Sequence, residues 1–186
     1  KEQWVVISKI DKLSKSEIET YQNKGYVIPD YKVPESVLRS LKEALEETLN
    51  INANIRPEQL ASVHTEKSSS DDTVGHSTFL KTALNSELVD LVSSVLGDNI
   101  IMWGVQVFCK PGVDGMEVPM HQDGQYWPIR PLKTCTMWLA IDDADRDNGC
   151  LQVIPGSHLG SIHYGHQKET RDKLVLNQSI KDPRLE

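Results

Sequence analysis

The sequence of 186 residues lacks any apolar run long enough to cross a bilayer, and no signal-peptide pattern opens it. It also lacks an excess of basic residues, because 20 Lys and Arg stand against 27 Asp and Glu, for a net charge of −7. Nucleic-acid binding needs a basic surface that displaces counterions from phosphate, so this charge balance argues against such a partner. We therefore expect a cytoplasmic protein whose partner is neither a membrane nor a nucleic acid.

Cysteine is scarce as well. The three cysteines (Cys109, Cys135 and Cys150) are an odd number and do not have the spacing of a metal site. Cys109 and Cys135 fall in segments expected to be strands, so the plain interpretation is buried free thiols in a reducing compartment. With 38% hydrophobic residues, the chain is expected to form one domain with a core of its own.

Helix signals dominate the N-terminal half of the sequence. Ser14 and Glu17 have the spacing of a capping box, and Gly25 is expected to end the helix that they start. Pro34 opens a second helix, in which apolar residues repeat at helical spacing at Val37, Leu38, Leu41, Ala44, Leu45 and Leu49. A third helix is expected from about Ser86 to Leu96.

Strand patterns dominate the second half. Short apolar runs bounded by turn residues predict strands at residues 4–7, 26–29, 100–108, 134–141 and 150–154. In 134–141, Cys135, Met137, Leu139 and Ile141 alternate with Thr134, Thr136, Trp138 and Ala140. Helices followed by antiparallel strands predict an α+β fold, with N-terminal flanking helices and a double-stranded β-helix, which is a cupin-like jelly-roll barrel.

The most informative motif is His121-Gln122-Asp123. The imidazole and the carboxylate stand two residues apart, so on an extended chain they share a face and can hold one ion together. With a histidine from a distant strand, they would form the two-histidine, one-carboxylate triad of non-haem Fe(II) oxygenases. Taken alone, the pair is better explained as a hydrogen bond in a surface turn.

The surrounding sequence favours the metal site. Four segments stand in order at compatible spacing: Gln106-Val-Phe-Cys-Lys-Pro-Gly112, His121-Gln-Asp-Gly-Gln-Tyr-Trp-Pro128, Thr136-Met-Trp-Leu-Ala-Ile-Asp142 and Asn148-Gly-Cys-Leu-Gln-Val-Ile-Pro-Gly-Ser-His158. Together they resemble the phytanoyl-CoA dioxygenase (PhyH) family of Fe(II)- and 2-oxoglutarate-dependent oxygenases. The resemblance covers nearly the whole chain.

This resemblance implies a function and a set of site residues. The protein would hydroxylate a C–H bond of a small molecule, using O2 and 2-oxoglutarate and releasing succinate and CO2. His121 and Asp123 would be the Fe(II) ligands, with no catalytic residue beyond them, and the carboxylate of Asp123 implies hydroxylation rather than halogenation. Gln106 and Trp138 would bind 2-oxoglutarate, and Tyr126 and Trp127 would border the substrate entrance. All four of these side chains have packing as the alternative role.

The third metal ligand and the arginine that pairs with 2-oxoglutarate in the family have no convincing counterpart. His166 and Arg171 have the right order, but they follow Asp123 too closely for the strands that should lie between. We therefore expect a single oxygenase domain, residues 1–186, without its C-terminal strands, and place the missing ligand and arginine beyond Glu186. The alternatives are a non-catalytic jelly-roll binding domain, or a cupin-like metalloenzyme without 2-oxoglutarate, which would need further His or Glu ligands near His121.

Overall fold

The computed structural model describes residues 12–67 and 72–185, and in these residues it contains four α-helices and one two-stranded antiparallel sheet. The helices are α1 (Lys15–Lys24), α2 (Glu35–Ile51), α3 (Ser77–Ala83) and α4 (Ser86–Leu96), and the strands are β1 (His166–Lys168) and β2 (Gln178–Ile180). Single 3-10 turns occur at Pro57–Gln59, Asp123–Gln125, Leu159–Ser161 and Pro183–Leu185. The expected strand at 4–7 lies outside the described residues. Among the described helices, none is both long enough and apolar enough to span a bilayer.

The three expected helices are confirmed with their local signals. Ser14 and Glu17 form both bonds of a capping box at the start of α1, and Gly25 ends it with φ +82°. An alanine at position 25 would also bring its Cβ to 2.6 Å from Nδ1 of His158, which lies in the Pro155–His158 turn. Nε2 of His158 is 2.9 Å from the carbonyl of Gln22. The turn therefore packs against the end of α1, which indicates a structural role for His158.

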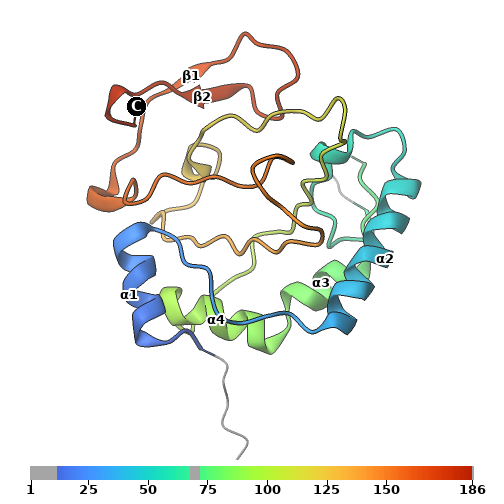
Figure 1. Cartoon of the computed structure of the whole chain (residues 1–186), viewed down its shortest axis with the longest axis horizontal. Coiled ribbons are helices and arrows are strands. Elements are labelled where there is room, and N and C mark those ends of the chain that lie inside the picture. The colour runs from blue at the N-terminus through green and yellow to red at the C-terminus, as the bar shows by residue number, and fades with distance from the viewer. Residues whose placement is uncertain (1–11, 68–71, 186) are drawn as a thin grey trace, which may run out of the picture.

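The core is built on the apolar face of α2. Leu41, Ala44 and Leu45 are buried there against four residues from other segments, which are Leu60, Val63, Phe79 and Val107. A second cluster joins α4 to the start of α1, because Leu13 packs on Leu88 and Leu91. In Figure 1 the helices border the molecule on one side, and the β1–β2 hairpin lies at the other, with long irregular segments between them.

Most of the expected strands are not formed. Residues 26–29, 100–108, 134–141 and 150–154 have neither helical nor strand structure, which corrects the prediction. A strand requires a neighbouring backbone to pair with its N–H and C=O groups. With the described residues, the backbone of segment 100–108 makes two isolated backbone–backbone bonds, from Val63 N to Val105 O and from Val107 N to Leu60 O. Within the described parts of the chain, 134–141 makes no backbone–backbone hydrogen bond.

The alternation predicted for 134–141 survives without the strand. Leu139 and Ile141 are half-buried and pack against the α2 core, whereas Thr136 and Trp138 are exposed. Met137 departs from the pattern because its side chain is exposed too. The fold is therefore α+β with helices first, as expected, but in the described residues its sheet is a hairpin rather than a barrel.

Candidate metal centre

The His121 motif lies along the hairpin that contains β1 and β2. Ile180 N donates to the carbonyl of Met120 at 2.8 Å. The side chain of Gln122 accepts from Tyr164 N at 2.8 Å and donates to the carbonyl of Ile162 at 2.9 Å. The chain then turns into the 3-10 turn Asp123–Gln125. The hairpin and the segment that leads into it thus hold the chain on both sides of His121.

His121 and Asp123 face each other. Nε2 of His121 is 3.1 Å from Oδ1 of Asp123, and Nδ1 of His121 is 2.8 Å from the carbonyl oxygen of Pro119. A carbonyl only accepts, so Nδ1 carries a proton and a neutral imidazole turns its Nε2 lone pair towards the carboxylate. Two acceptors at this distance need a cation between or beside them. Either a second proton on His121 or a metal ion meets that need.

The same distance suits two neighbouring ligands of one ion. Metal–ligand bonds of about 2.1 Å at a right angle place the two donor atoms about 3.0 Å apart. In the metal-free protein the Asp123 hydrogen bond raises the pKa of His121, and burial opposes the shift. The pKa of Asp123 is lowered, chiefly by the hydrogen bond from His121. The residues present therefore fit a divalent metal at two of its positions.

Thr136 orients the carboxylate. Its Oγ1 donates to Oδ2 of Asp123 at 3.1 Å, which leaves Oδ1 for His121 or for an ion. A hydrogen-bonded partner of this kind commonly fixes the orientation of a metal ligand. The sequence pattern placed Thr136 only on one face of an expected strand. Trp138, a predicted site residue, lies two residues later on the same face, and this could have indicated that Thr136 is near the site.

His166 also reaches this region. The ring of Tyr126 has an edge contact with His121 at 6.0 Å between centroids and another with His166 at 6.4 Å. Nδ1 of His166 is 2.9 Å from the carbonyl of Tyr164, so Nε2 is left to accept from Gln122 N at 3.1 Å. Within the described residues, no group of three or more His, Cys, Asp or Glu could hold a metal ion. His166 is thus near the pair, but its Nε2 is already hydrogen-bonded.

The other expected site residues are less closely associated. The side chains of Gln106 and Trp138 are exposed, and in the described structure neither forms a hydrogen bond with His121 or Asp123. Tyr126 is brought to the pair, and its hydroxyl donates to Gln178 O at 3.4 Å. Trp127 is half-buried beside it in the chain.

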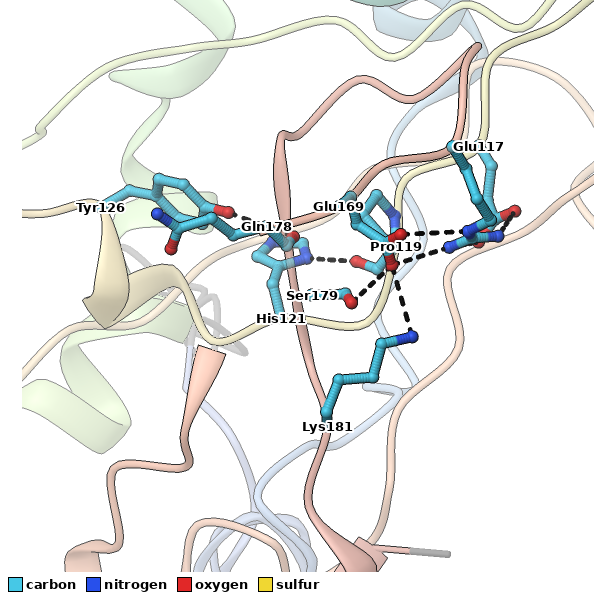
Figure 2. Close-up of polar contacts among 9 residues, drawn as sticks. Glu117, Pro119, His121, Tyr126, Glu169, Gln178, Ser179 and Lys181 are labelled. Carbon is cyan, nitrogen blue, oxygen red and sulfur yellow. Dashed lines mark hydrogen bonds and ion pairs between the residues drawn. The ribbon is translucent and has the colours of Figure 1, made fainter. Parts of the chain in front are cut away.

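A charged cluster lies beside the motif (Figure 2) and was not predicted. Arg171 donates to Glu117 at 3.0 Å and to Glu169 at 3.0 Å, so its guanidinium is engaged by protein carboxylates. Ser179 donates to Glu169 at 2.5 Å, and Lys181 lies 3.5 Å from it. These contacts hold the pKa of Glu169 at about 2, with the hydrogen bond from Arg171 as the largest cause. No sequence motif marks this cluster.

A second buried carboxylate leads to a prediction for acid stability. Arg56 donates to Glu58, whose side chain is fully buried, and holds its pKa at about 2 against an ordinary value of 4.5. A carboxyl with a lowered folded-state pKa stabilises the fold above its unfolded-state pKa, and this contribution is lost as the pH falls to the folded-state value. We therefore expect Glu58→Gln to flatten the decline in unfolding free energy between pH 4.5 and about 2, as measured by urea titration. An unchanged slope would contradict this assignment.

Comparisons with known proteins identify the family. The family model described as Phytanoyl-CoA dioxygenase (PhyH) matches residues 21–182. A probable phytanoyl-CoA dioxygenase of Caenorhabditis elegans is 38% identical over 82 residues, which are 40% of this chain and 26% of the worm protein. The peroxisomal phytanoyl-CoA dioxygenase of Homo sapiens is 38% identical over 81 residues, which are 41% of this chain and 24% of the human protein.

A third relative extends the match slightly. The phytanoyl-CoA dioxygenase domain-containing protein 1 of Danio rerio is 32% identical over 99 residues, 44% of this chain and 34% of the fish protein. The chain thus matches these relatives over about a quarter to a third of their length. No solved structure gave a significant match. Because the family match runs through most of the chain and includes the His121 motif, the protein belongs to the phytanoyl-CoA dioxygenase family, as its sequence predicted.

Proposed function

We propose that the protein is an Fe(II)- and 2-oxoglutarate-dependent dioxygenase that hydroxylates a C–H bond of a small molecule. One oxygen atom of O2 enters the product, and the other enters the succinate that forms from 2-oxoglutarate with loss of CO2. The observation that carries this proposal is the approach of His121 Nε2 and Asp123 Oδ1 to 3.1 Å within the motif shared with an oxygenase family.

In this proposal His121 and Asp123 hold the iron, and bound Fe(II) supplies the redox chemistry with O2 and 2-oxoglutarate. Pro119 keeps the proton of His121 on Nδ1, which leaves Nε2 unprotonated for the metal once the second proton departs. Thr136 holds Oδ2 of Asp123, so that Oδ1 is the ligand atom. A carboxylate ligand at this position fits hydroxylation.

The remaining site residues have proposed roles around this pair. Gln106 would donate to a carboxylate oxygen of 2-oxoglutarate, and Trp138 would shield the cosubstrate from water. Tyr126 and Trp127 would border the substrate entrance, a role supported for Tyr126 by its contact with His121. We further propose that the complete fold is a jelly roll of the family's type, supported by family membership and by the alternation in 134–141.

Substrate class and location are part of the same proposal. We propose a small metabolite rather than an anionic acyl-CoA thioester, because a net charge of −7 would not attract a polyanion. All three cysteines are free thiols, which supports a reducing compartment such as the cytoplasm.

Trp138 gives a prediction about the cosubstrate. Trp138→Ala should weaken 2-oxoglutarate binding about tenfold, because the loss of an apolar wall costs roughly 1.4 kcal/mol of binding free energy. The affinity for the metal alone should change little, since Trp138 has no bond to either proposed ligand. Calorimetric titration of 2-oxoglutarate in the presence of Mn(II) measures the first quantity. Trp103→Ala, which removes another exposed tryptophan, is the control; equal effects of both variants would leave Trp138 with a packing role only.

A non-catalytic jelly-roll binding domain is the second candidate. It is favoured by one observation, that the described residues contain no group of three metal ligands. Anaerobic addition of Fe(II) and 2-oxoglutarate separates the two candidates, because the oxygenase should develop a visible metal-to-cosubstrate charge-transfer band that disappears when O2 is admitted. Absence of the band at saturating Fe(II) and 2-oxoglutarate would favour the binding domain.

A further inference from the structure

Five side chains fasten the segment before His121 to the β1–β2 hairpin. They are Glu117, Glu169, Arg171, Ser179 and Lys181, and we refer to them as the Glu169 cluster. Arg171 joins its two acidic members, because Nη1 donates to Glu117 at 3.0 Å, while Nη2 and Nε donate to Glu169 at 3.0 and 3.2 Å. Figure 2 draws these contacts together with the bond between His121 and Pro119.

Glu169 is the centre of the cluster. Its side chain is only 6% exposed, and it bonds to Arg171 after β1 and to Ser179 in β2. A carboxylate withdrawn from water is tolerated where several donors satisfy it, and its loss leaves its partners uncompensated. The cluster is therefore a rigid connection between the two arms of the hairpin, to which Arg171 adds Glu117.

A short path of contacts leads from the cluster to His121. The backbone of Glu117 is bonded twice to the hairpin, since its N–H donates to Lys173 O at 3.1 Å and its carbonyl accepts from Val175 N at 2.9 Å. Two residues later, the Pro119 carbonyl accepts from Nδ1 of His121 at 2.8 Å. The next carbonyl, that of Met120, accepts from Ile180 N in β2. The four residues that support the His121 ring are thus held at both ends by the hairpin.

We propose that Glu169 and Arg171 are positioning residues of the metal centre: by holding Glu117–Met120, they place the Pro119 carbonyl so that His121 keeps its proton on Nδ1 and directs Nε2 at Asp123. This inference rests on the proposed function for its consequence in metal binding. It also gives Arg171 a role different from binding 2-oxoglutarate, for which the order of His166 and Arg171 made it a candidate.

The test compares Glu169→Gln with a matched control. Glu169→Gln keeps the shape of the side chain and removes its charge, so Arg171 should loosen and release Glu117. Asp182→Asn is the control, because Asp182 is also nearly buried, also pairs with an arginine (Arg184) and also has a pKa of about 2. Asp182 follows β2, and among the described residues no hydrogen bond or ion pair joins its side chain to Glu117–Met120. The two variants therefore lose similar ion pairs at different places.

Two readouts are taken on folded protein. The ¹⁵N shifts of the His121 ring in metal-free protein report its tautomer and hydrogen bonding, and titration with Co(II) reports the affinity of the metal pair. Glu169→Gln should change the His121 shifts and weaken Co(II) binding about tenfold or more, the usual effect of losing a residue that orients a ligand. Asp182→Asn should change neither. Glu117→Gln alters an exposed member of the cluster and leaves Glu169 paired, so it should change the His121 shifts and the Co(II) affinity in the same direction but by less. It replaces Glu169→Gln in the test if that variant does not fold.

The outcomes separate this inference from the function on which it rests. If Glu169→Gln and Glu117→Gln both leave the His121 shifts and the Co(II) affinity as in the parent protein, the positioning role is wrong while the metal site stands. If the parent protein binds no Co(II), the proposed function fails, and the His121 shifts still test the connection to the cluster. If Arg171→Gln weakens only 2-oxoglutarate binding, Arg171 binds the cosubstrate and the positioning role is overturned.

Discussion

Asp123→Ala is expected to abolish hydroxylation and to reduce metal affinity by more than about 100-fold. The variant removes the carboxylate that converges with His121 at 3.1 Å, so one imidazole alone would remain of the pair. Loss of a residue that only orients a ligand already costs 10- to 100-fold, and loss of the ligand itself should cost more. Co(II) titration and the succinate formed from 2-oxoglutarate measure the two effects.

The fold should tolerate this change, because Asp123 is partly exposed and lies in a short turn. Asp172→Ala is a suitable control, since it removes an exposed aspartate from the hairpin region that carries no proposed ligand. Hydroxylation by Asp123→Ala at the parental rate would remove Asp123 from the metal site and with it the main support for the proposed function.

Leu60→Ala is expected to lower the free energy of unfolding by about 2–5 kcal/mol, as for other fully buried leucines. The Leu60 side chain is completely buried among Leu41, Ala44 and Phe79, and its carbonyl accepts a backbone hydrogen bond from Val107 N. Removing it leaves a cavity where α2 meets the segment that carries Gln106. Urea unfolding followed by circular dichroism measures the change.

Leu84→Ala is the control, because it makes the same substitution at a leucine that follows α3 and is 58% exposed. It should change the free energy of unfolding by less than about 0.5 kcal/mol. Equal effects of the two substitutions would mean that Leu60 is not at the centre of the core.

The helices were predictable because their signals are local. The capping box at Ser14 and the glycine at position 25 both lie in the helix that they define, and the apolar spacing of α2 marks the face that packs. α3 was missed because it has only seven residues and is capped by His76, which is not a usual cap residue. The strand predictions were wrong because strand pairing is not local. An apolar pattern predicts which side of a segment is buried, but not whether another backbone lies beside it to form hydrogen bonds.

The candidate site likewise contains residues that local sequence predicts and residues that only the folded chain brings together. His121 and Asp123 were predicted as a pair because their spacing and the sequence around them are informative, and their approach in the structure needs only a local turn. Thr136 reaches Asp123 from a different segment, and the Pro119 carbonyl is a backbone atom that no residue type marks. Glu169 is buried by contacts that form only when the hairpin closes. These supporting groups became visible only in the folded chain.

The position of a bound paramagnetic ion tests the central claim most directly. Mn(II) is added in small amounts to the ¹⁵N-labelled protein, and line broadening is followed at the ring nitrogens of all six histidines. His121 should broaden first, together with the backbone amide of Asp123, and His64, His76 and His158 should stay sharp. The same titration of Asp123→Ala should show no localised broadening. Broadening centred elsewhere, or none at His121, would contradict a metal centre at His121 and Asp123.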